Sequence, residues 1–516
     1  MFRLASAAVG LAAMMFLGVS ANASMAQDTL QRGGVLTAAM DLEPATLDPA
    51  FGNAPGKDRT VYNQIFEGLY IQSEDGSLLP QLAETWDIAS DGLSVVFHLR
   101  KGVTFHDGTP FNAEAAKFNL DRIINPDSGA RARQFVVDLA SAEVVDEFTL
   151  KVSFAQPSGA VLSGLANEAG AMSSPTALAA DPEGFGRNPV GTGPFRFVSW
   201  QGGDRITVER YDGYWGKDSA GEQLPYLDGV VTRFIPNSAV KIVEVRSGNV
   251  LLGDTILDKD YAQIEADPNV DIFPNHVGTA QFASFNLTRP PFDNVDLRKA
   301  VALGINRQAI SDIVTGGTGT VTPTFEPQTS WAFAEGLQPH AYDPDQAKAA
   351  YKASGHSGPI TLSVIQRDPD TRIAQIIQAQ LAEVGITIKI ETLERQAWLD
   401  KVLKHDYEFA VHRANTPRVD PDMSFSTYYS RNAASNYPGV SDEAIFDAVD
   451  KARSMSDQAE RAKVYIDIQR MLLDNYYQTY FFFRNNADII HTSLHGVERD
   501  FSGQWVFTSA WIAGGK

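Results

Sequence analysis

The stretch from Thr85 to Ala115, TWDIASDGLSVVFHLRKGVTFHDGTPFNAEA, constrains the fold of this chain most strongly. Apolar and polar side chains alternate from Leu93 to Arg100, which predicts a half-buried strand. A Lys-Gly pair ends that strand, and Val103 to Phe105 predicts a second short strand before an Asp-Gly turn. Asn112 is then placed to cap a helix with one apolar face. The stretch is predicted to fold as strand, turn, strand, turn and helix, and it contains no obvious nucleophile or metal cluster.

The same stretch resembles the signature of the family 5 solute-binding proteins, which are the dipeptide-, oligopeptide- and nickel-binding proteins of ABC importers. The matching positions are Trp86, Asp91, Gly92, Phe97, Leu99, Arg100, Gly102, Val103, Phe105, His106, Asp107, Gly108, Pro110, Phe111 and Ala113. An Asp usually follows two residues after that last Ala in the family, whereas this chain has Ala115, which we interpret as a change on the helix surface. The resemblance implies an α/β, two-lobed periplasmic-binding-protein fold (type II, cluster C) with a hinge and an inserted subdomain in the first lobe.

The length of 516 residues is too great for one ordinary hydrophobic core, so two or three domains are expected. The resemblance divides the chain further. We expect a signal peptide at 1–26, lobe I at 27–67 and 191–280, the inserted subdomain at 68–190, lobe II at 281–492, and a C-terminal return to lobe I at 493–516.

The first 26 residues have the features of a secretory signal. Arg3 gives a positive start, Leu4 to Val19 is apolar, and Ala21–Ala23 and Ser24–Ala26 are two possible cleavage sites. A retained membrane anchor is disfavoured because the apolar run is short. The chain has no Cys, which excludes disulfides and a lipid-modified Cys. We expect a free, non-lipidated protein in a bacterial periplasm.

The charge and composition exclude several classes of partner. The formal net charge is -20, which argues against nucleic acid and anionic membranes. Hydrophobic residues make up 44% of the chain and charged residues 21%, as in a folded globular protein. We expect a monomer without direct membrane insertion.

The second lobe can be predicted from residue patterns. Ile360 to Val364 alternates as a strand, Ile373 to Val384 carries a helical apolar face, and Ile386 to Ile390 alternates as the next strand. Asp370 or Thr371 is predicted to cap the helix. A strand-helix-strand unit of this length predicts two parallel strands joined by a right-handed crossover.

Ligands of open parallel sheets bind beyond the carboxyl ends of the strands. Two loops at such ends, Gln366–Arg372 and Arg413–Asp422, carry four arginines: Arg367, Arg372, Arg413 and Arg418. Guanidinium groups bind carboxylates, phosphates or sulfates with paired donors, so we expect at least one to contact a ligand. The alternative is surface ion pairs with neighbouring acids, worth at most ~1 kcal/mol each. Those acids are Asp368, Asp370, Asp420 and Asp422.

The resemblance indicates what kind of solute these loops bind. Peptide-binding relatives hold the ligand's α-ammonium with an Asp three residues before an Asp-Pro pair, and with Asp420-Pro421 as that pair the position is Pro417. The amine anchor is therefore absent. Arg372 is the nearest match to an arginine that holds a peptide carboxylate in some relatives. A peptide-like or anionic, opine-like solute is predicted, rather than an ordinary free-amine dipeptide.

Four further residues are candidates for the ligand site. Trp398 and Trp331 could form walls of a cleft, since aromatic rings supply contact area at low entropic cost, although core packing is the commoner role. Asn286 lies at the expected junction of the lobes and Phe51 follows the first turn of lobe I. These last two are suggested by family position.

An enzyme is the main rival class. The chain lacks a Gly-x-Ser-x-Gly motif and any Cys, which removes the α/β-hydrolase elbow and thiol catalysis. Ser238 to Lys241 matches Ser-x-x-Lys, but the accompanying motifs of penicillin-recognising enzymes are missing. A secreted hydrolase is therefore disfavoured, and we expect no enzymatic activity and no cofactor.

A metal chelate is the second rival solute, because one branch of the resembled family carries nickel. Nine His are scattered along the chain, and none of them forms a cluster with metal-ligand spacing. His412 borders a predicted ligand loop and could contact a chelate, although packing is the commoner role. We expect no metal site in the protein itself.

The function implied by the resemblance is that of a periplasmic substrate-binding protein of an ABC importer. Such a protein captures a small solute between two lobes and delivers it to inner-membrane permease subunits. Solute shifts an open-closed equilibrium only through contacts that differ between the two forms.

Overall fold

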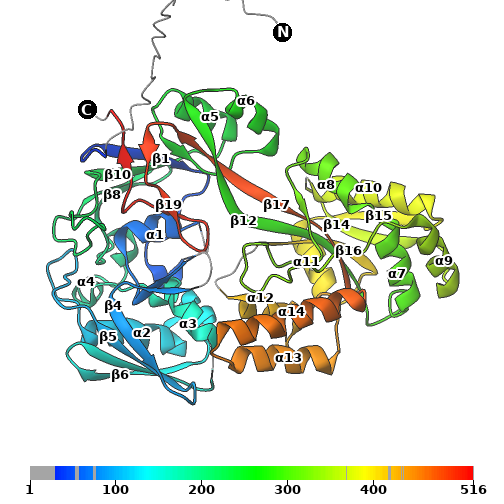
Figure 1. Ribbon diagram of the computed structural model, residues 1–516, viewed down its shortest axis with the longest axis horizontal. Helices are drawn as coiled ribbons and strands as arrows, with labels where there is room; N and C mark the ends of the chain where they lie inside the picture. Colours follow the sequence, from blue (N-terminus) through cyan, green and yellow to red (C-terminus); the bar gives the residue numbers. More distant parts are fainter. Residues whose placement is uncertain are drawn as a thin grey trace, which may run out of the picture.

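The computed structural model describes residues 30–52, 57–73, 77–157, 159–367, 369–415, 420–431, 433 and 435–514, and these form two lobes (Figure 1). The segment expected to be a signal peptide lies outside the described residues. Two long antiparallel strands, β12 (Val270–Phe285) and β17 (Gln478–His491), run from one lobe into the other. They are the middle of one sheet with the order β15-β14-β16-β12-β17-β11-β1-β10-β9-β8, in which β13 also pairs with β17. The lobes are joined by a continuous sheet.

The first lobe holds one end of this sheet and both termini of the described chain. Its strands are β1 (Val35–Met40), β8 (Phe195–Gln201), β9 (Arg205–Arg210), β10 (Gly229–Phe234) and β11 (Leu252–Gly253). Its helices are η1 (Pro49–Phe51), α1 (Arg59–Ile65), α5 (Ser238–Arg246), η6 (Asp258–Asp260) and α6 (Tyr261–Glu265). The C-terminal strands form two short pairs, β18 (Leu494–His495) with β21 (Trp511–Ile512) and β19 (Glu498–Arg499) with β20 (Trp505–Val506). Leu36, Phe195 and Trp505 meet in one core, so the C-terminal segment packs into this lobe.

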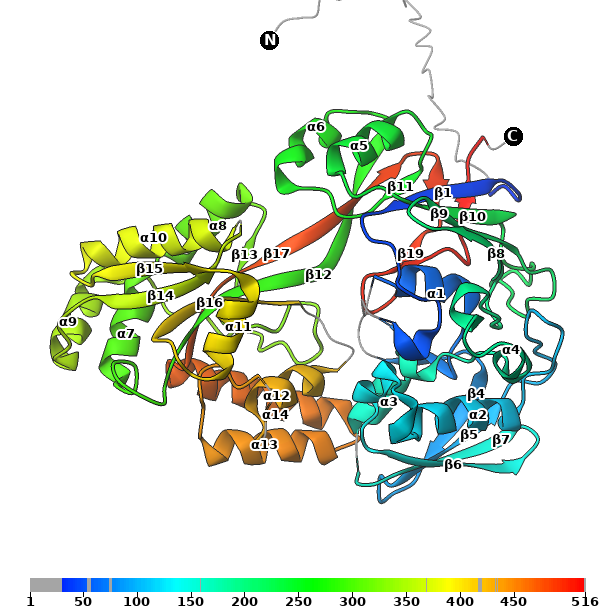
Figure 2. The ribbon, with the colours of Figure 1, turned by 180° about the vertical axis from the view of Figure 1, so that it is seen from behind.

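A separate antiparallel sheet lies at the lower edge of the first lobe in Figure 2. Its order is β4 (Ala83–Ile88), β5 (Ser94–Leu99), β7 (Thr149–Phe154) and β6 (Leu139–Asp146). The other elements here are β2 (Tyr70–Gln72), β3 (Leu78–Pro80), α2 (Ala113–Ile124), η2 (Pro126–Ser128), η3 (Arg131–Phe135), α3 (Gly159–Leu165), η4 (Glu168–Gly170), α4 (Pro175–Ala180) and η5 (Phe185–Arg187). The sheet and α2 enclose a hydrophobic core of their own.

Most of the sequence-based prediction for Thr85 to Ala115 is confirmed. The predicted strand is β5, and the side chain of Asn112 caps α2 by accepting a hydrogen bond of 3.1 Å from the backbone N–H of Ala115. The prediction of a second short strand is wrong, because Thr104 forms only an isolated bridge to Pro110. The turns on either side leave this segment too short to extend a ladder.

The second lobe confirms the predicted parallel unit. β14 (Ile360–Ile365) pairs in parallel with β15 (Ile388–Leu393), and α10 (Asp370–Glu383) connects them. The predicted cap is wrong, because Pro369 precedes the helix without a side-chain cap. β16 (Phe409–Asn415) also runs parallel to β14, so three carboxyl ends lie at one edge of the sheet.

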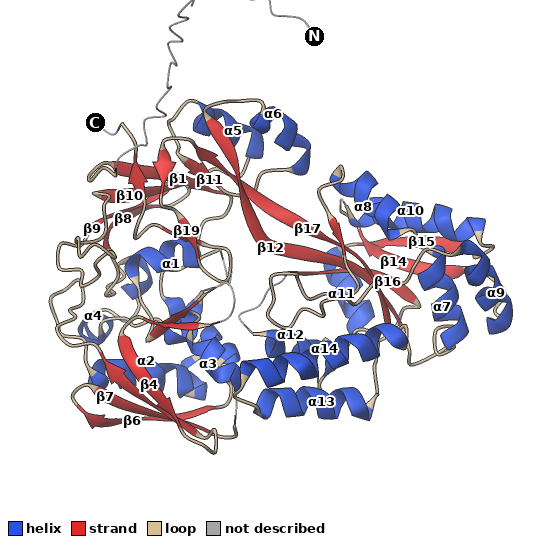
Figure 3. Ribbon diagram, viewed as in Figure 1, coloured by secondary structure: helices blue, strands red, loops and turns tan. Residues whose placement is uncertain are grey.

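Helices cover both faces of these strands (Figure 3). They are α7 (Val295–Gly304), α8 (Arg307–Thr315), α9 (Pro344–Ser354), α10, α11 (Arg395–Leu403), α12 (Pro421–Tyr429), α13 (Glu443–Ser454) and α14 (Gln458–Asp474). The short strand β13 (Thr320–Val321) follows α8. In the part of the chain that the structure describes, none of the helices has the length and apolar character to cross a membrane.

Candidate functional site

Four arginines, which we call the arginine cluster, gather near the carboxyl ends of the parallel strands: Arg367, Arg395, Arg413 and Arg484. Arg367 follows β14, Arg395 begins α11 after β15, and Arg413 lies near the end of β16. The pKa of Arg413 is lowered, first by burial and then by repulsion from the other three guanidinium groups. Positive charge is thus concentrated where ligands of parallel sheets bind.

Two members of the arginine cluster are neutralised by acids. Arg367 Nε lies 2.5 Å from Asp370 Oδ2, and Arg484 Nε lies 3.0 Å from Asp258 Oδ2 in η6 of the first lobe. The alternative of a local ion pair therefore holds for Arg367. Within the described ranges the guanidinium of Arg413 has neither a hydrogen bond nor an ion pair, although Asp370 lies close enough to favour its charge. A guanidinium left in this state suits an anionic ligand.

Arg395 and Arg484 were missed by the sequence analysis. The rule that ligands bind beyond the carboxyl ends of parallel strands would have identified Arg395, because it lies two residues after the end of β15. No local signal marks Arg484, since β17 reaches the cluster from near the C-terminal end of the chain. Of the other predicted arginines, Arg372 is exposed in the first turn of α10, and Arg418 lies outside the described residues.

Trp398 belongs to an aromatic group on the other face of the sheet. Its side chain is 7% exposed, and its ring meets that of His412 edge to face at 4.8 Å. His412 is buried between Phe282 at 5.3 Å and Tyr437 at 4.7 Å, and burial lowers its pKa to about 3. The imidazole is therefore neutral. Trp398 Nε1 and His412 Nδ1 are both buried and have no hydrogen-bond partner in the described part of the chain.

The remaining aromatic candidates are packed against cations. The ring of Trp331 lies 5.9 Å from that of Tyr465, and the Arg461 guanidinium lies 5.2 Å from the Trp331 ring. Phe51 is half-buried at the end of η1, with the Arg122 guanidinium 5.0 Å from its ring. Neither ring adjoins the arginine cluster in any described contact.

Asn286 follows β12 and is 1% exposed. Its amide nitrogen donates to the backbone oxygens of His405 at 2.7 Å and Tyr407 at 2.8 Å, and its oxygen accepts from Thr288. The side chain holds the turn before β16 and has its hydrogen bonds satisfied.

The two acids beside the second loop are held by other arginines. Asp420 is fully buried and accepts two hydrogen bonds from Arg461, of 2.7 and 2.6 Å. Asp422 Oδ2 lies 3.4 Å from Arg453 Nε. Neither acid forms an ion pair with Arg413, and Asp368, another acid named in that alternative, lies outside the described residues.

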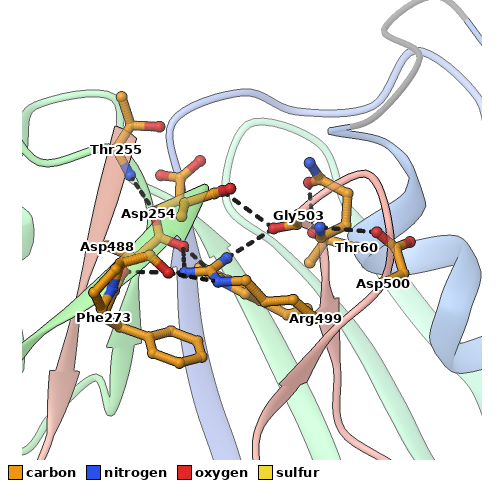
Figure 4. Close-up of polar contacts among 12 residues, drawn as sticks. Thr60, Asp254, Thr255, Phe273, Asp488, Arg499, Asp500 and Gly503 are labelled. Atoms are coloured by element: carbon orange, nitrogen blue, oxygen red, sulfur yellow. Dashed lines mark hydrogen bonds and ion pairs between the residues drawn. The ribbon is translucent and has the colours of Figure 1, made fainter. Parts of the chain in front are cut away.

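A second buried network fixes the first lobe where β12 and β17 enter it (Figure 4). Arg499 pairs with Asp488 at 2.9 Å and donates to the backbone oxygens of Phe273 and Gly503 at 3.1 and 2.7 Å. Trp505 Nε1 also donates to Asp488, at 2.7 Å. The C-terminal segment is thereby bonded to both long strands.

Within the described ranges, no group of three or more His, Asp or Glu side chains is arranged to hold a metal ion. The neutral His412 imidazole is packed between the aromatic rings of Phe282 and Tyr437.

The family model described as bacterial extracellular solute-binding proteins, family 5 Middle, matches residues 77–436. The glutathione-binding protein GsiB of Pectobacterium atrosepticum is 30% identical over 437 residues, covering 82% of this chain and 84% of the relative. The GsiB protein of Salmonella choleraesuis is 32% identical over 357 residues, covering 68% and 67%.

Solved structures of similar proteins confirm the two-lobed α/β fold. The periplasmic binding protein DppA from Helicobacter pylori, in complex with the peptide STSA, is 25% identical, with a TM-score of 0.74 over 94% of this chain and 99% of that one. AgaA from A. tumefacien R10, in complex with agropinic acid, is 28% identical, with a TM-score of 0.73 over 93% and 99%. HbpA2 from Haemophilus parasuis is 23% identical, with a TM-score of 0.84 over 93% and 100%. The chain belongs to the bacterial extracellular solute-binding proteins of family 5.

Proposed function

We propose that this protein is the periplasmic solute-binding component of an ABC importer, and that it captures a small solute between its lobes for delivery to membrane permease subunits. The family match and the glutathione- and peptide-binding relatives support this role. The lobes are joined through β12 and β17, which is the arrangement a hinge requires.

The solute is proposed to be anionic, with its carboxylate bound by Arg413. The observation that carries this proposal is that the guanidinium of Arg413, within the arginine cluster, has no hydrogen-bond or ion-pair partner among the described residues. Arg413 is exposed and is repelled by the other three guanidinium groups, and a bidentate carboxylate would offset that repulsion. AgaA, whose structure holds agropinic acid, and GsiB, named for glutathione, are relatives associated with organic acids.

Several other features belong to the same proposal. The protein reaches the periplasm through a cleaved signal peptide, carries no lipid anchor, acts as a monomer and releases its solute chemically unchanged. The proposal includes the division of the chain into lobes at the residues given in the sequence analysis. The presence of Trp505 in the same hydrophobic core as Leu36 and Phe195 supports a C-terminal return to the first lobe.

The test is to purify the protein from periplasmic extract, identify the co-purifying solute by mass spectrometry, and measure its Kd by calorimetry. Arg413→Ala is expected to weaken binding at least ~10-fold, the loss of about 1.4 kcal/mol or more. Arg205→Ala is the matched control, because Arg205 is an exposed arginine of β9 paired with Asp204. An unchanged Kd in Arg413→Ala would remove the anionic assignment. Conversion of the solute during incubation would contradict the binding role.

A further inference from the structure

Gln281 lies beside Arg413 on the same face of the central sheet. The two residues are direct partners in the antiparallel register of β12 and β16, so their side chains project to the same side. Arg484 is the partner of Thr279, two residues along β12 from Gln281, and therefore faces that side as well. Gln281 therefore lies between Arg484, which is paired with Asp258, and Arg413, which has no partner among the described residues.

The amide oxygen of Gln281 is buried and unsatisfied. The residue is 2% exposed, and its Oε1 accepts no hydrogen bond from any residue that the structure describes. A buried polar atom without a partner costs about 1–3 kcal/mol, whereas a leucine would fill similar space without that cost. Two neighbouring groups, an acceptor at Gln281 and a cationic donor at Arg413, thus have no partner among the described residues.

We propose that Gln281 and Arg413 form one subsite for a carboxylate that adjoins an N–H group, as in an N-acylated amino acid or the C-terminal residue of a peptide. The guanidinium donates two hydrogen bonds to the carboxylate, and Gln281 Oε1 accepts from the neighbouring N–H. The inference rests on the proposed function and names the chemistry of its solute.

The surrounding charges favour an anion at this subsite. Asp370, the acid that acts on Arg413, is bound by Arg367, while Asp258 is bound by Arg484. These two pairs carry no net charge. Arg413 beside Gln281 and the exposed Arg395 at the start of α11 remain as positive charges of the arginine cluster, and a carboxylate on Arg413 lowers their mutual repulsion.

The test uses three small probes on the full-length secreted protein: N-acetylglycine, N-acetylsarcosine, which has N–CH₃ in place of N–H, and N-acetylglycinamide, which lacks the carboxylate. Binding is followed by NMR titration up to about 50 mM. We expect N-acetylglycine to bind about tenfold more tightly than N-acetylsarcosine, which is the value of one hydrogen bond to a buried acceptor. It should bind at least about tenfold more tightly than N-acetylglycinamide, which loses the charge-assisted bonds to Arg413. Equal binding of all three, or no binding of N-acetylglycine, overturns the subsite.

The Gln281→Leu variant tests whether Gln281 contacts the ligand or only contributes to the folded structure. We expect this variant to melt at the same or a higher temperature without ligand, because an unsatisfied polar atom is removed, and to bind N-acetylglycine only as tightly as N-acetylsarcosine. Retained preference for N-acetylglycine in Gln281→Leu would overturn the role of the glutamine. If a co-purified solute depends on Arg413 but not on Gln281, the subsite fails and the proposed function stands. If the protein binds no solute in periplasmic extract, the proposed function itself fails.

Discussion

Ser163 of the first lobe donates a hydrogen bond of 2.9 Å to Asp420 of the second lobe. Ser163 lies in α3, and Asp420 is the N-cap of α12. Both residues are buried, although they join two separate lobes. Figures 1 and 2 show α3 meeting the second lobe on the side of the molecule away from β12 and β17. The lobes therefore touch through a specific polar contact as well as through the connecting strands.

Ser163→Ala should shift the protein towards a more separated arrangement of its lobes. The substitution removes a hydrogen bond across the lobes, worth about 1 kcal/mol, while Arg461 continues to satisfy Asp420. We expect solute affinity to fall up to about fivefold and the radius of gyration from X-ray scattering to rise. Ser426→Ala is the control, because Ser426 donates to Asp422 within α12. Equal effects of both variants would show that the contact between the lobes has no special role.

Arg461→Met should destabilise the second lobe strongly. Arg461 is 3% exposed and holds the fully buried Asp420 through two hydrogen bonds. Removing one partner leaves an uncompensated buried charge, at a cost of about 3–5 kcal/mol. Urea unfolding measures this loss. The control is Arg470→Met, which breaks an exposed pair with Asp467 and should cost less than about 1 kcal/mol. A small effect at Arg461 would mean that water reaches Asp420.

Asp258→Asn should tighten the binding of an anionic solute. Asp258 neutralises Arg484 at 3.0 Å, so its removal adds an unpaired positive charge to the arginine cluster. We expect a gain of several-fold in affinity at low salt, and a smaller gain as screening increases. Calorimetry at two salt concentrations checks this. Asp260→Asn is the matched control, since Asp260 lies in the same short helix and accepts from Gln263. Weaker binding in Asp258→Asn would indicate a cationic solute.

The stability of the protein should fall in acid partly because of His412. Burial lowers its pKa from 6.5 to about 3, so below pH 6.5 the unfolded chain binds a proton that the folded chain does not. This residue makes no pH-dependent contribution above pH 6.5, and it lowers the free energy of unfolding by about 1.4 kcal/mol per pH unit between pH 6.5 and 3. His412→Phe removes this dependence and keeps a ring between Phe282 and Tyr437.

Urea midpoints of the wild type and His412→Phe at several pH values check this prediction. The difference between the two proteins should change with pH only below about 6.5. If the urea midpoints of both proteins change equally with pH, the imidazole is already solvated in the folded state. His98→Phe is a control, because His98 is an exposed histidine beside Asp87.

The sequence by itself determined the local elements and the chemistry of the loops. Alternation from Leu93 to Arg100 corresponds to β5, and the pattern from Ile360 to Ile390 corresponds to the parallel unit of β14, α10 and β15. In strands and helices, side chains point to one face at a fixed spacing within a short segment. These elements can therefore be predicted without knowing which residues pack against them. The rule about strand ends identified Arg413 in the same way.

Only the tertiary structure decided which side chains meet. Arg367 and Arg413 both lie near the carboxyl ends of parallel strands, yet one is neutralised by Asp370 and the other has no described partner. Arg484 and Gln281 join the same region because β12 lies between β16 and β17 in the sheet. Which side chains become neighbours across strands distant in sequence depends on strand register and on the packing of the whole chain. The sequence of one short segment determines neither of these.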